Sequence, residues 1–271
     1  MGATSPQAAL TAPFELGFTG PPVLLIHGFT GTPWDLRPMA EALADAGYRV
    51  RVPRLPGHGL DPLAMEDVRA TDWRGVVESE LLRLSARGPV HVVGLSMGAL
   101  LGSIAAGHLP GLTASLTLLA PALRLAGVPE RVVAQLSGWN VLPSIHPWLH
   151  KSGTDIRDPE TRLTAPLLRA YPRARLGDLV RVQAWARRAL PQVRCPVLVI
   201  DSAKDRVIHA SAAGSVVRRL RGSPRVRTLH LKESGHVMTR DLEHRRVERE
   251  VLDFLRGLQP VRAPEQPVSA A

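Results

Sequence analysis

This chain of 271 residues contains a single cysteine, Cys195, few aromatic residues and only three lysines. One cysteine excludes a disulfide within the chain, so nothing in the sequence indicates an oxidising compartment. No apolar run approaches the length of about 18 residues that a membrane-spanning helix needs. The N-terminus also lacks the basic and apolar regions of a signal peptide. We therefore expect a soluble cytoplasmic protein without stable membrane insertion.

The formal net charge of +10 comes almost entirely from arginines, which are spread from Arg37 to Arg262. Such a charge could attract nucleic acid or an anionic membrane. The densest groups, such as residues 218–221, alternate with apolar residues at helical spacing, as solvated helix faces do. Because no basic stripe is interleaved with aromatic residues, we expect no nucleic-acid partner. The oligomeric state does not follow from the sequence.

The arrangement of apolar residues predicts an α/β fold, with a mostly parallel sheet covered by helices on both faces. Short β-type runs alternate along the chain with amphipathic helical segments. The expected strands are 23–26, 48–52, 90–93, 115–119, 197–200 and 226–230. The expected helices run from an N-cap at Thr32 to Gly47, from an N-cap at Thr71 to Gly88, over 99–106, around 211–220 and over 241–258.

The alternation breaks after Pro121. Residues 122–191 contain many prolines and three of the five tryptophans, Trp139, Trp148 and Trp185. A structureless loop of that length is improbable, so we predict a small, mostly helical cap inserted into the core. The core is then formed by residues 1–121 and 192–258. The Pro- and Ala-rich tail, residues 259–271, is expected to be disordered.

The strongest motif is Gly94-Leu95-Ser96-Met97-Gly98, which directly follows the apolar run 90–93. A strand, a sharp turn and a helix form the context in which G-x-S-x-G is a nucleophile elbow. The turn holds the serine in a strained backbone conformation, and the glycines leave room for neighbouring elements. Taken alone, the pentapeptide also fits a glycine-rich strand-to-helix turn without a catalytic role. Its interpretation therefore depends on whether a base and an acid occur elsewhere in the sequence.

A serine nucleophile needs a base and an acid, and in this topology they follow it in the order acid, then histidine. His236, on a loop after the last expected strand, is the candidate base. Asp205 is the candidate acid, and Asp201 is the rival because it directly ends the preceding strand. The cations Lys204 and Arg206 beside Asp205 are positioned to depress the pKa of its carboxyl.

The oxyanion of such a reaction needs two backbone donors. Met97 supplies one N–H at the start of the elbow helix. The segment His27–Gly31 follows the first apolar strand, and the N–H of Phe29 is the second candidate donor. His27 is interpreted as a structural loop residue because His236 already fits the role of base.

These segments, together with the turn Pro56–Gly59, resemble the α/β-hydrolase superfamily, and more closely thermostable bacterial carboxylesterases and monoacylglycerol lipases. The resemblance covers about residues 22–258 and is weakest in the cap. It implies a serine hydrolase of small-molecule carboxylic esters, of short to medium acyl chain or monoacylglycerols. It further implies Ser96 as nucleophile, Asp205 and His236 as acid and base, Phe29 and Met97 as oxyanion donors, no cofactor and no metal, and a cap that shapes the acyl pocket.

Other functions remain open at this point. Thioesterase, acyltransferase, lactonase or amidase activity would use the same three residues. A non-catalytic ligand receptor on this fold would normally lack a member of the triad, whereas every position here is filled.

His146 and His150 are spaced for a metal on one helix face, but Pro147 lies between them and no H-E-x-x-H motif is present. Cys195 is expected to be a small apolar filler.

Overall fold

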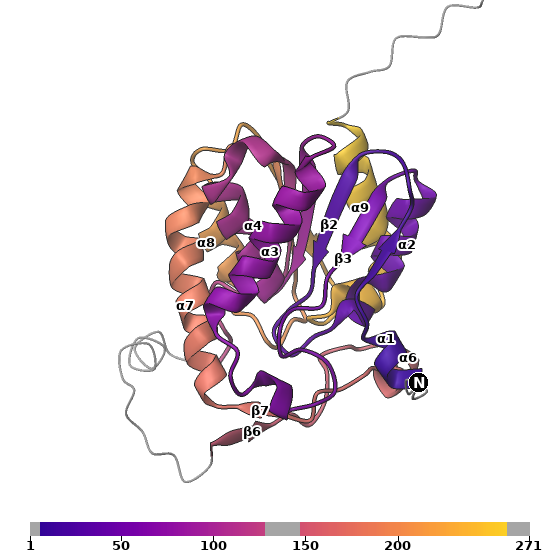
Figure 1. Ribbon diagram of the computed structural model, residues 1–271, viewed down its shortest axis with the longest axis vertical. Coiled ribbons are helices and arrows are strands. Elements are labelled where there is room, and N and C mark those ends of the chain that lie inside the picture. The colour runs from indigo at the N-terminus through magenta and orange to yellow at the C-terminus, as the bar shows by residue number, and fades with distance from the viewer. Residues whose placement is uncertain (1–5, 128–146, 259–271) are drawn as a thin grey trace, which may run out of the picture.

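The computed structural model describes residues 6–127 and 147–258, and its centre is a seven-stranded sheet (Figure 1). Within this sheet all strand pairs are parallel except β1–β3 at one edge, which is antiparallel. In spatial order the strands are β1 (Phe14–Leu16), β3 (Arg49–Val52), β2 (Pro22–Ile26), β4 (Val90–Leu95), β5 (Thr113–Leu119), β8 (Val197–Ser202) and β9 (Val226–Leu231). The expected α/β fold class is confirmed.

Helices cover both faces of this sheet, as Figure 1 shows. One face carries α3 (Ala70–Ser85), α4 (Met97–His108) and α7 (Ala174–Ala189), which pack against one another. The opposite face carries α2 (Arg37–Asp45) and α9 (His244–Arg256). The remaining helices are α1 (Pro6–Leu10), α6 (Pro159–Thr164) and α8 (Ala212–Val217), and short 3-10 turns lie at Pro33–Leu36, Leu63–Met65, Pro110–Leu112, Leu190–Gln192 and Met238–Arg240.

Burial follows the position of each strand in the sheet. The central strands β2 and β4 are buried at every residue, as expected for parallel strands with helices on both sides. In β3, Val50 and Val52 are buried while Arg49 and Arg51 are only partly covered. Arg51 donates two hydrogen bonds to Glu80 on α3, at 2.7 and 3.0 Å. The alternating sequence therefore matches a strand beside the sheet edge.

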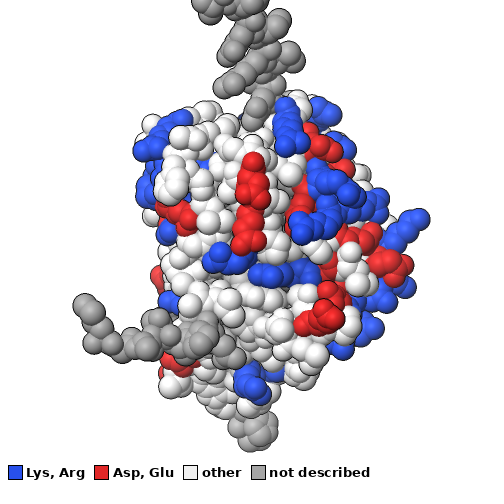
Figure 2. Space-filling view, turned by 90° about the vertical axis from the view of Figure 1, so that its right-hand side faces the viewer, with Lys and Arg blue, Asp and Glu red and all other residues white. Residues whose placement is uncertain are grey.

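Charged side chains of both signs lie close together on the face shown in Figure 2, where basic and acidic residues alternate. Among the ion pairs of the described residues are those of Glu15 with Arg49, Arg51 and Arg83. Such exposed pairs contribute little to stability, about 0–1 kcal/mol each. Within the described ranges, no helix combines the length and apolarity needed to span a bilayer.

Three local expectations are corrected by the structure. Thr71 is not an N-cap, because α3 begins at Ala70 and the backbone N–H of Arg69 donates to Asp72 Oδ2 at 2.8 Å. The helix expected after Thr32 is divided into a 3-10 turn and α2. The edge strand β1 was not expected, because three residues are too few to show a periodic pattern.

The segment expected to form a cap contains different kinds of structure. The strands β6 (Trp148–His150) and β7 (Ala170–Pro172) form an antiparallel pair, whereas α7 packs on α4 as part of a layer that covers the sheet. Because α7 belongs to the layer that covers the sheet, we infer that a cap inserted after Pro121 ends before residue 174. Trp139 lies outside the described residues, as does the tail 259–271.

Close packing in the centre of the fold gives a test of the backbone geometry. A Cβ at Gly98 would lie 2.1 Å from the carbonyl oxygen of Ile26, so Gly98→Ala is expected to lower the free energy of unfolding by about 2 kcal/mol or more. The matched control is Gly75→Ala in α3, where a Cβ meets no atom within 4 Å. It should raise stability by about 0.5–1 kcal/mol. Urea unfolding measures both, and equal effects would contradict the packing described.

Candidate active site

Ser96 lies at the tip of the turn between β4 and α4. Its backbone has φ 59° and ψ −115°, a left-handed conformation that only glycine adopts without strain. The turn is held by the Ser96 N–H, which donates to the carbonyl of Leu119 at 2.8 Å. The Ser96 carbonyl in turn accepts from the N–H of Ala99 and of Ala122, at 3.2 and 3.3 Å. The neighbouring elements therefore fix the position of the serine.

His236 and Asp205 form a hydrogen-bonded pair on two loops that follow neighbouring strands. His236 Nδ1 donates to Asp205 Oδ2 over 2.8 Å, and the two side chains are 11% and 5% exposed. Asp205 Oδ1 accepts the backbone N–H of Val207 and of Ile208. The carboxylate thus keeps the ring proton on Nδ1 and leaves the lone pair on Nε2, the form that a general base needs.

The environment of Asp205 favours its ionised form. Burial raises the pKa of the carboxyl, but the charge and hydrogen bond of His236 and the two backbone N–H donors outweigh it, so the pKa is lowered. Lys204 and Arg206, the cations expected to depress this pKa, are exposed and are not among its main causes. The paired histidine supplies the stabilising charge instead.

The rival acid Asp201 lies elsewhere. Its Oδ2 is 3.1 Å from Nδ1 of His230 on the neighbouring strand β9, and the His230 side chain is exposed. Of the two aspartates that the sequence leaves open, the structure brings Asp205 to His236.

Ser96 and His236 line one cavity, although among the described residues Ser96 Oγ donates no hydrogen bond to the histidine. Such contacts are often long before substrate binds.

The two candidate oxyanion donors belong to segments next to Ser96: Met97 follows it in the chain, and Phe29 lies in the loop after β2. Among the described residues, neither the N–H of Met97, at the first position of α4, nor that of Phe29 has a hydrogen-bond partner. A Cβ at Gly28 would approach Ser96 Cβ to 3.0 Å, so the loop preceding α2 lies directly against the serine. Two free donors beside a serine are what a developing oxyanion requires.

His27 has a structural role, as interpreted from the sequence. Its Nε2 accepts the N–H of Leu55 at 3.0 Å, and its Nδ1 donates to the carbonyl of Gly28 at 3.0 Å. Burial holds the pKa of this imidazole well below its usual range, helped by the nearby His58. Both ring nitrogens are therefore occupied in a neutral side chain that supports the Phe29 loop.

The cavity has a volume of about 440 Å³ and opens beside Ser96. Its apolar lining includes Phe29, Tyr171, Leu176 and Leu179. The rings of Phe29 and Tyr171 pack edge to face at 5.2 Å. Trp148 and Trp185, the described tryptophans of the expected cap, are not among the residues that line it.

Three carboxylates that were not predicted hold the loops of the candidate acid and base. Asp155 Oδ2, from the segment after β6, accepts the N–H of Arg206 at 2.9 Å and of His236 at 3.0 Å. One oxygen thereby ties both loops to the segment that follows β6. No local sequence pattern marks such an acceptor, because its donors lie 51 and 81 residues away in the chain.

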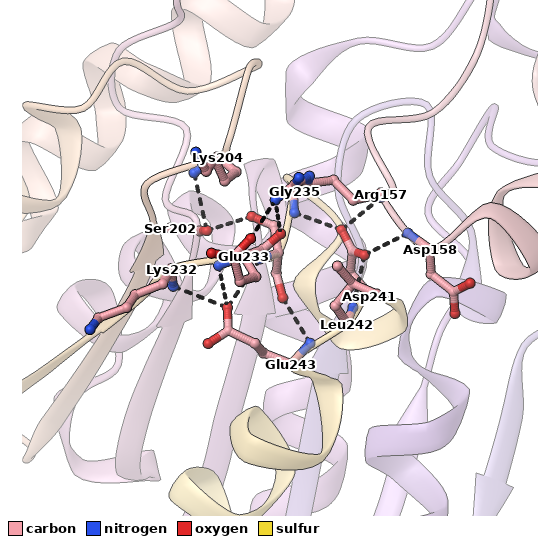
Figure 3. Close-up of polar contacts among 11 residues, drawn as sticks. Arg157, Asp158, Ser202, Lys204, Lys232, Glu233, Gly235, Asp241, Leu242 and Glu243 are labelled. Atoms are coloured by element: carbon pink, nitrogen blue, oxygen red, sulfur yellow. Dashed lines mark hydrogen bonds and ion pairs between the residues drawn. The ribbon is translucent and has the colours of Figure 1, made fainter.

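The other two carboxylates, Asp241 and Glu243, precede helix α9, and Figure 3 shows the N–H groups that converge on them. Asp241 is fully buried. Its oxygens accept the N–H of Arg157, Asp158, Gly235 and Leu242. Glu243 Oε2 accepts three further N–H groups, from residues 232–234. The loop that carries His236 is therefore fixed by charge-assisted hydrogen bonds along its length.

Neither a metal site nor a reactive thiol emerges from the described residues. Within 6–127 and 147–258, no three His, Cys, Asp or Glu side chains gather as they would around a metal ion. His146 lies outside these ranges. Cys195 is buried, and its burial raises the pKa of the thiol to about 12, which agrees with its interpretation as a packing residue.

Comparison with known proteins gives consistent matches. A model of the "Alpha/beta hydrolase family" matches residues 23–250. The chain is 34% identical over 233 residues to a "Thermostable monoacylglycerol lipase" of Bacillus sp. (strain H-257), covering 86% of this chain and 89% of that protein. It is 26% identical to a "Carboxylesterase" of Bacillus subtilis (strain 168), over 87% and 92% of the two chains.

A solved structure agrees with these sequence matches. It belongs to a study of LipS and LipT, described as two metagenome-derived lipolytic enzymes, and superposes with a TM-score of 0.83 at 32% identity. The superposition covers 93% of this chain and 98% of the other.

The two aspartates can be distinguished by the reactivity of Ser96. Asp205→Asn is expected to slow phosphonylation of Ser96 by a fluorophosphonate about 10⁴-fold, because an amide no longer holds the ring proton on Nδ1 of His236. Asp201→Asn is the matched control and should change the rate less than about threefold. The second-order rate constant measures both, and the reverse order would assign the acid to Asp201.

Asp155 gives a second test. Asp155→Ala removes the acceptor shared by the N–H groups of Arg206 and His236, and is expected to slow the same reaction about 10- to 100-fold through misplacement of the two loops. Asp155→Asn keeps one oxygen and should restore much of the rate. Asp158→Ala, in the same segment but at the start of α6, is the control. Equal rates for Asp155→Ala and Asp158→Ala would contradict a role for Asp155 in positioning the loops.

Proposed function

This chain belongs to the α/β-hydrolase family, and we propose that it hydrolyses carboxylic esters through an acyl-enzyme formed on Ser96. The observation that carries the proposal is that His236, which lines the same cavity as Ser96, is hydrogen-bonded to Asp205 at 2.8 Å. The activities named for the similar Bacillus proteins support ester hydrolysis as the reaction. The assignment of each residue's role is our proposal from geometry.

In the first half of the reaction, Ser96 Oγ attacks the ester carbonyl while His236 Nε2 takes its proton. Negative charge that develops on the carbonyl oxygen is stabilised by the N–H groups of Phe29 and Met97. Asp205 stays ionised and stabilises the imidazolium. The tetrahedral intermediate collapses, the bond to the alcohol breaks, and His236 gives its proton to the leaving oxygen.

In the second half, water replaces the alcohol. His236 Nε2 takes a proton from the water as its oxygen attacks the acyl carbonyl, and the proton then returns to Ser96 Oγ as the acid leaves. Every proton transfer in these reaction steps is performed by side chains of the protein itself. The cavity of about 440 Å³, with its aromatic and aliphatic lining, fits a short- to medium-chain acyl ester or a monoacylglycerol.

The test is a panel of aryl esters of increasing acyl length and of monoacylglycerols, run with the wild type and with Ser96→Ala. The wild type is expected to hydrolyse them, and Ser96→Ala to lose about 10⁵-fold or more in kcat because the nucleophile is absent. Ser103→Ala is the matched control, since among the described residues that hydroxyl donates only to the carbonyl of Ala99 within α4. It should retain activity within about threefold.

Three results would contradict the proposal: no ester turnover by the wild type, full activity in Ser96→Ala, or full activity in His236→Ala. Thioesters, lactones, amides and acceptor alcohols in the same panel measure the alternative acyl-transfer activities that the triad also permits. If kcat/KM for one of these substrates exceeds the value for every oxygen ester, the activity on that substrate would replace ester hydrolysis as the main reaction.

A further inference from the structure

Lys151 places a positive charge next to the candidate oxyanion hole. It directly follows β6, and its backbone N–H donates to the carbonyl of Arg169 at 2.9 Å. Its Nζ donates to Thr30 Oγ1 at 2.9 Å, and Thr30 is the residue after Phe29. Lys151 and Thr30 both line the cavity that contains Ser96 and His236. The ammonium therefore lies within reach of a bound substrate.

This ammonium has few partners in the protein. Among residues 6–127 and 147–258, its one hydrogen bond is the contact with Thr30, and no Asp or Glu oxygen lies within ion-pair distance. An ammonium has three donors, so two remain without a protein acceptor in that part of the chain. The carboxylate of Asp35 acts on it only at longer range, and Asp35 Oδ2 accepts the N–H of Thr32. Burial lowers the pKa of Lys151, and only the charge of Asp35 opposes this.

The other charged groups of the cavity do not offset Lys151. Asp155 lines the cavity, and its Oδ2 already accepts two backbone N–H groups. Asp205 lies outside the lining and is paired with His236. The remaining charged residue of the lining is a further cation, Arg206, whose side chain is exposed. The described part of the cavity thus holds cations with unused donors, whereas the carboxylate in its lining, Asp155, already accepts two hydrogen bonds. An anionic group is the ligand that such a lining favours.

We propose that Lys151 binds a carboxylate carried by the ester substrate, so that this enzyme prefers anionic esters with the carboxylate a few bonds from the scissile carbonyl. Two substrate classes have this chemistry: half-esters of dicarboxylic acids, with the charge on the acyl side, and acyl esters of hydroxy acids, with the charge on the alcohol side. The proposal rests on the proposed ester hydrolysis at Ser96 and adds the class of substrate. Lys151 determines specificity and takes no part in proton transfer.

The experiment compares esters that differ only in charge. On the acyl side, monomethyl succinate is paired with dimethyl succinate. On the alcohol side, O-acetylglycolate is paired with its neutral methyl ester, with release of acetate as the readout. In Lys151→Met the ratio of kcat/KM for the anionic ester to that for the neutral ester is expected to fall about tenfold in at least one pair, which corresponds to about 1.4 kcal/mol. The kcat/KM for neutral esters should change less than about threefold.

Two control variants separate binding from other effects. Lys204→Met removes an exposed cation near Asp205, outside the cavity lining, and should leave the ratio within about twofold. Thr30→Val removes the hydroxyl but keeps the ammonium, and should change the rates for anionic and neutral esters alike. If near-UV circular dichroism shows that Lys151→Met is unfolded, Lys151→Gln keeps a donor for Thr30 without the charge and gives the same comparison.

The outcomes are distinct. The assignment of Lys151 is overturned if the anionic-to-neutral ratio of kcat/KM is unchanged in the Lys151 variants. It is also overturned if Lys204→Met or Thr30→Val lowers this ratio equally. Either result leaves ester hydrolysis intact. A preference for hydroxylated neutral esters that Lys151→Met abolishes also overturns it, because the ligand is then a hydroxyl and not an anion. A wild type that hydrolyses none of the four esters and none of the aryl esters contradicts the proposed function itself.

Discussion

The candidate site depends on the close approach of helix α4 to the carboxyl end of β2. A side chain at Gly98 would collide with the carbonyl oxygen of Ile26, and one at Gly94 would collide with the backbone of Gly98. Because both positions are glycine, the helix can begin directly beside the loop that follows β2. This contact brings the N–H groups of Met97 and Phe29 to the same serine, which neither segment could achieve alone. The positive φ of Ser96 is a consequence of the same turn.

A second group of interactions fixes the two loops that carry the candidate acid and the candidate base. Asp155, Asp241 and Glu243 together accept the backbone N–H groups of residues 234–236 and of Arg206 in the loop of the candidate acid. The segment after β6 therefore contributes to the geometry of the candidate triad as well as to the wall of the cavity. Lys151 lies on that same segment, so one stretch of chain both positions the triad and contacts substrate in our account.

Much of this arrangement follows from local sequence pattern. The mostly apolar runs in β2, β4 and β8 predict buried parallel strands. Serine, aspartate and histidine follow the carboxyl ends of β4, β8 and β9 in that order, which predicts that they meet at one edge of the sheet. The sequence already favours Asp205 over Asp201. In the structure Asp205 lies on the loop after β8 and contacts His236, whereas Asp201 lies within β8 and contacts His230.

What the sequence did not reveal depends on contacts between distant segments. Strand β1 exists because β3 offers it an edge, and the start of α3 is set by Arg69 and Asp72 rather than by the hydroxyl of Thr71. The role of Asp155 depends on backbone N–H groups in two distant loops. Because nearly every residue type has such a group, the sequence does not identify these donors. Helix α7 resembles a cap helix in the sequence because it follows a proline-rich stretch, but its burial against α4 is a property of the folded chain.

The central claim is that ester hydrolysis proceeds through an acyl group bonded to Ser96. The most direct measurement is intact mass and peptide mapping of the protein, acid-quenched during turnover of an activated aryl ester. The account predicts one added acyl group per chain, located on the peptide that contains Ser96 and released as turnover ends. Turnover with no covalent adduct on a millisecond-to-second time scale, or with the acyl group on another residue, would contradict it.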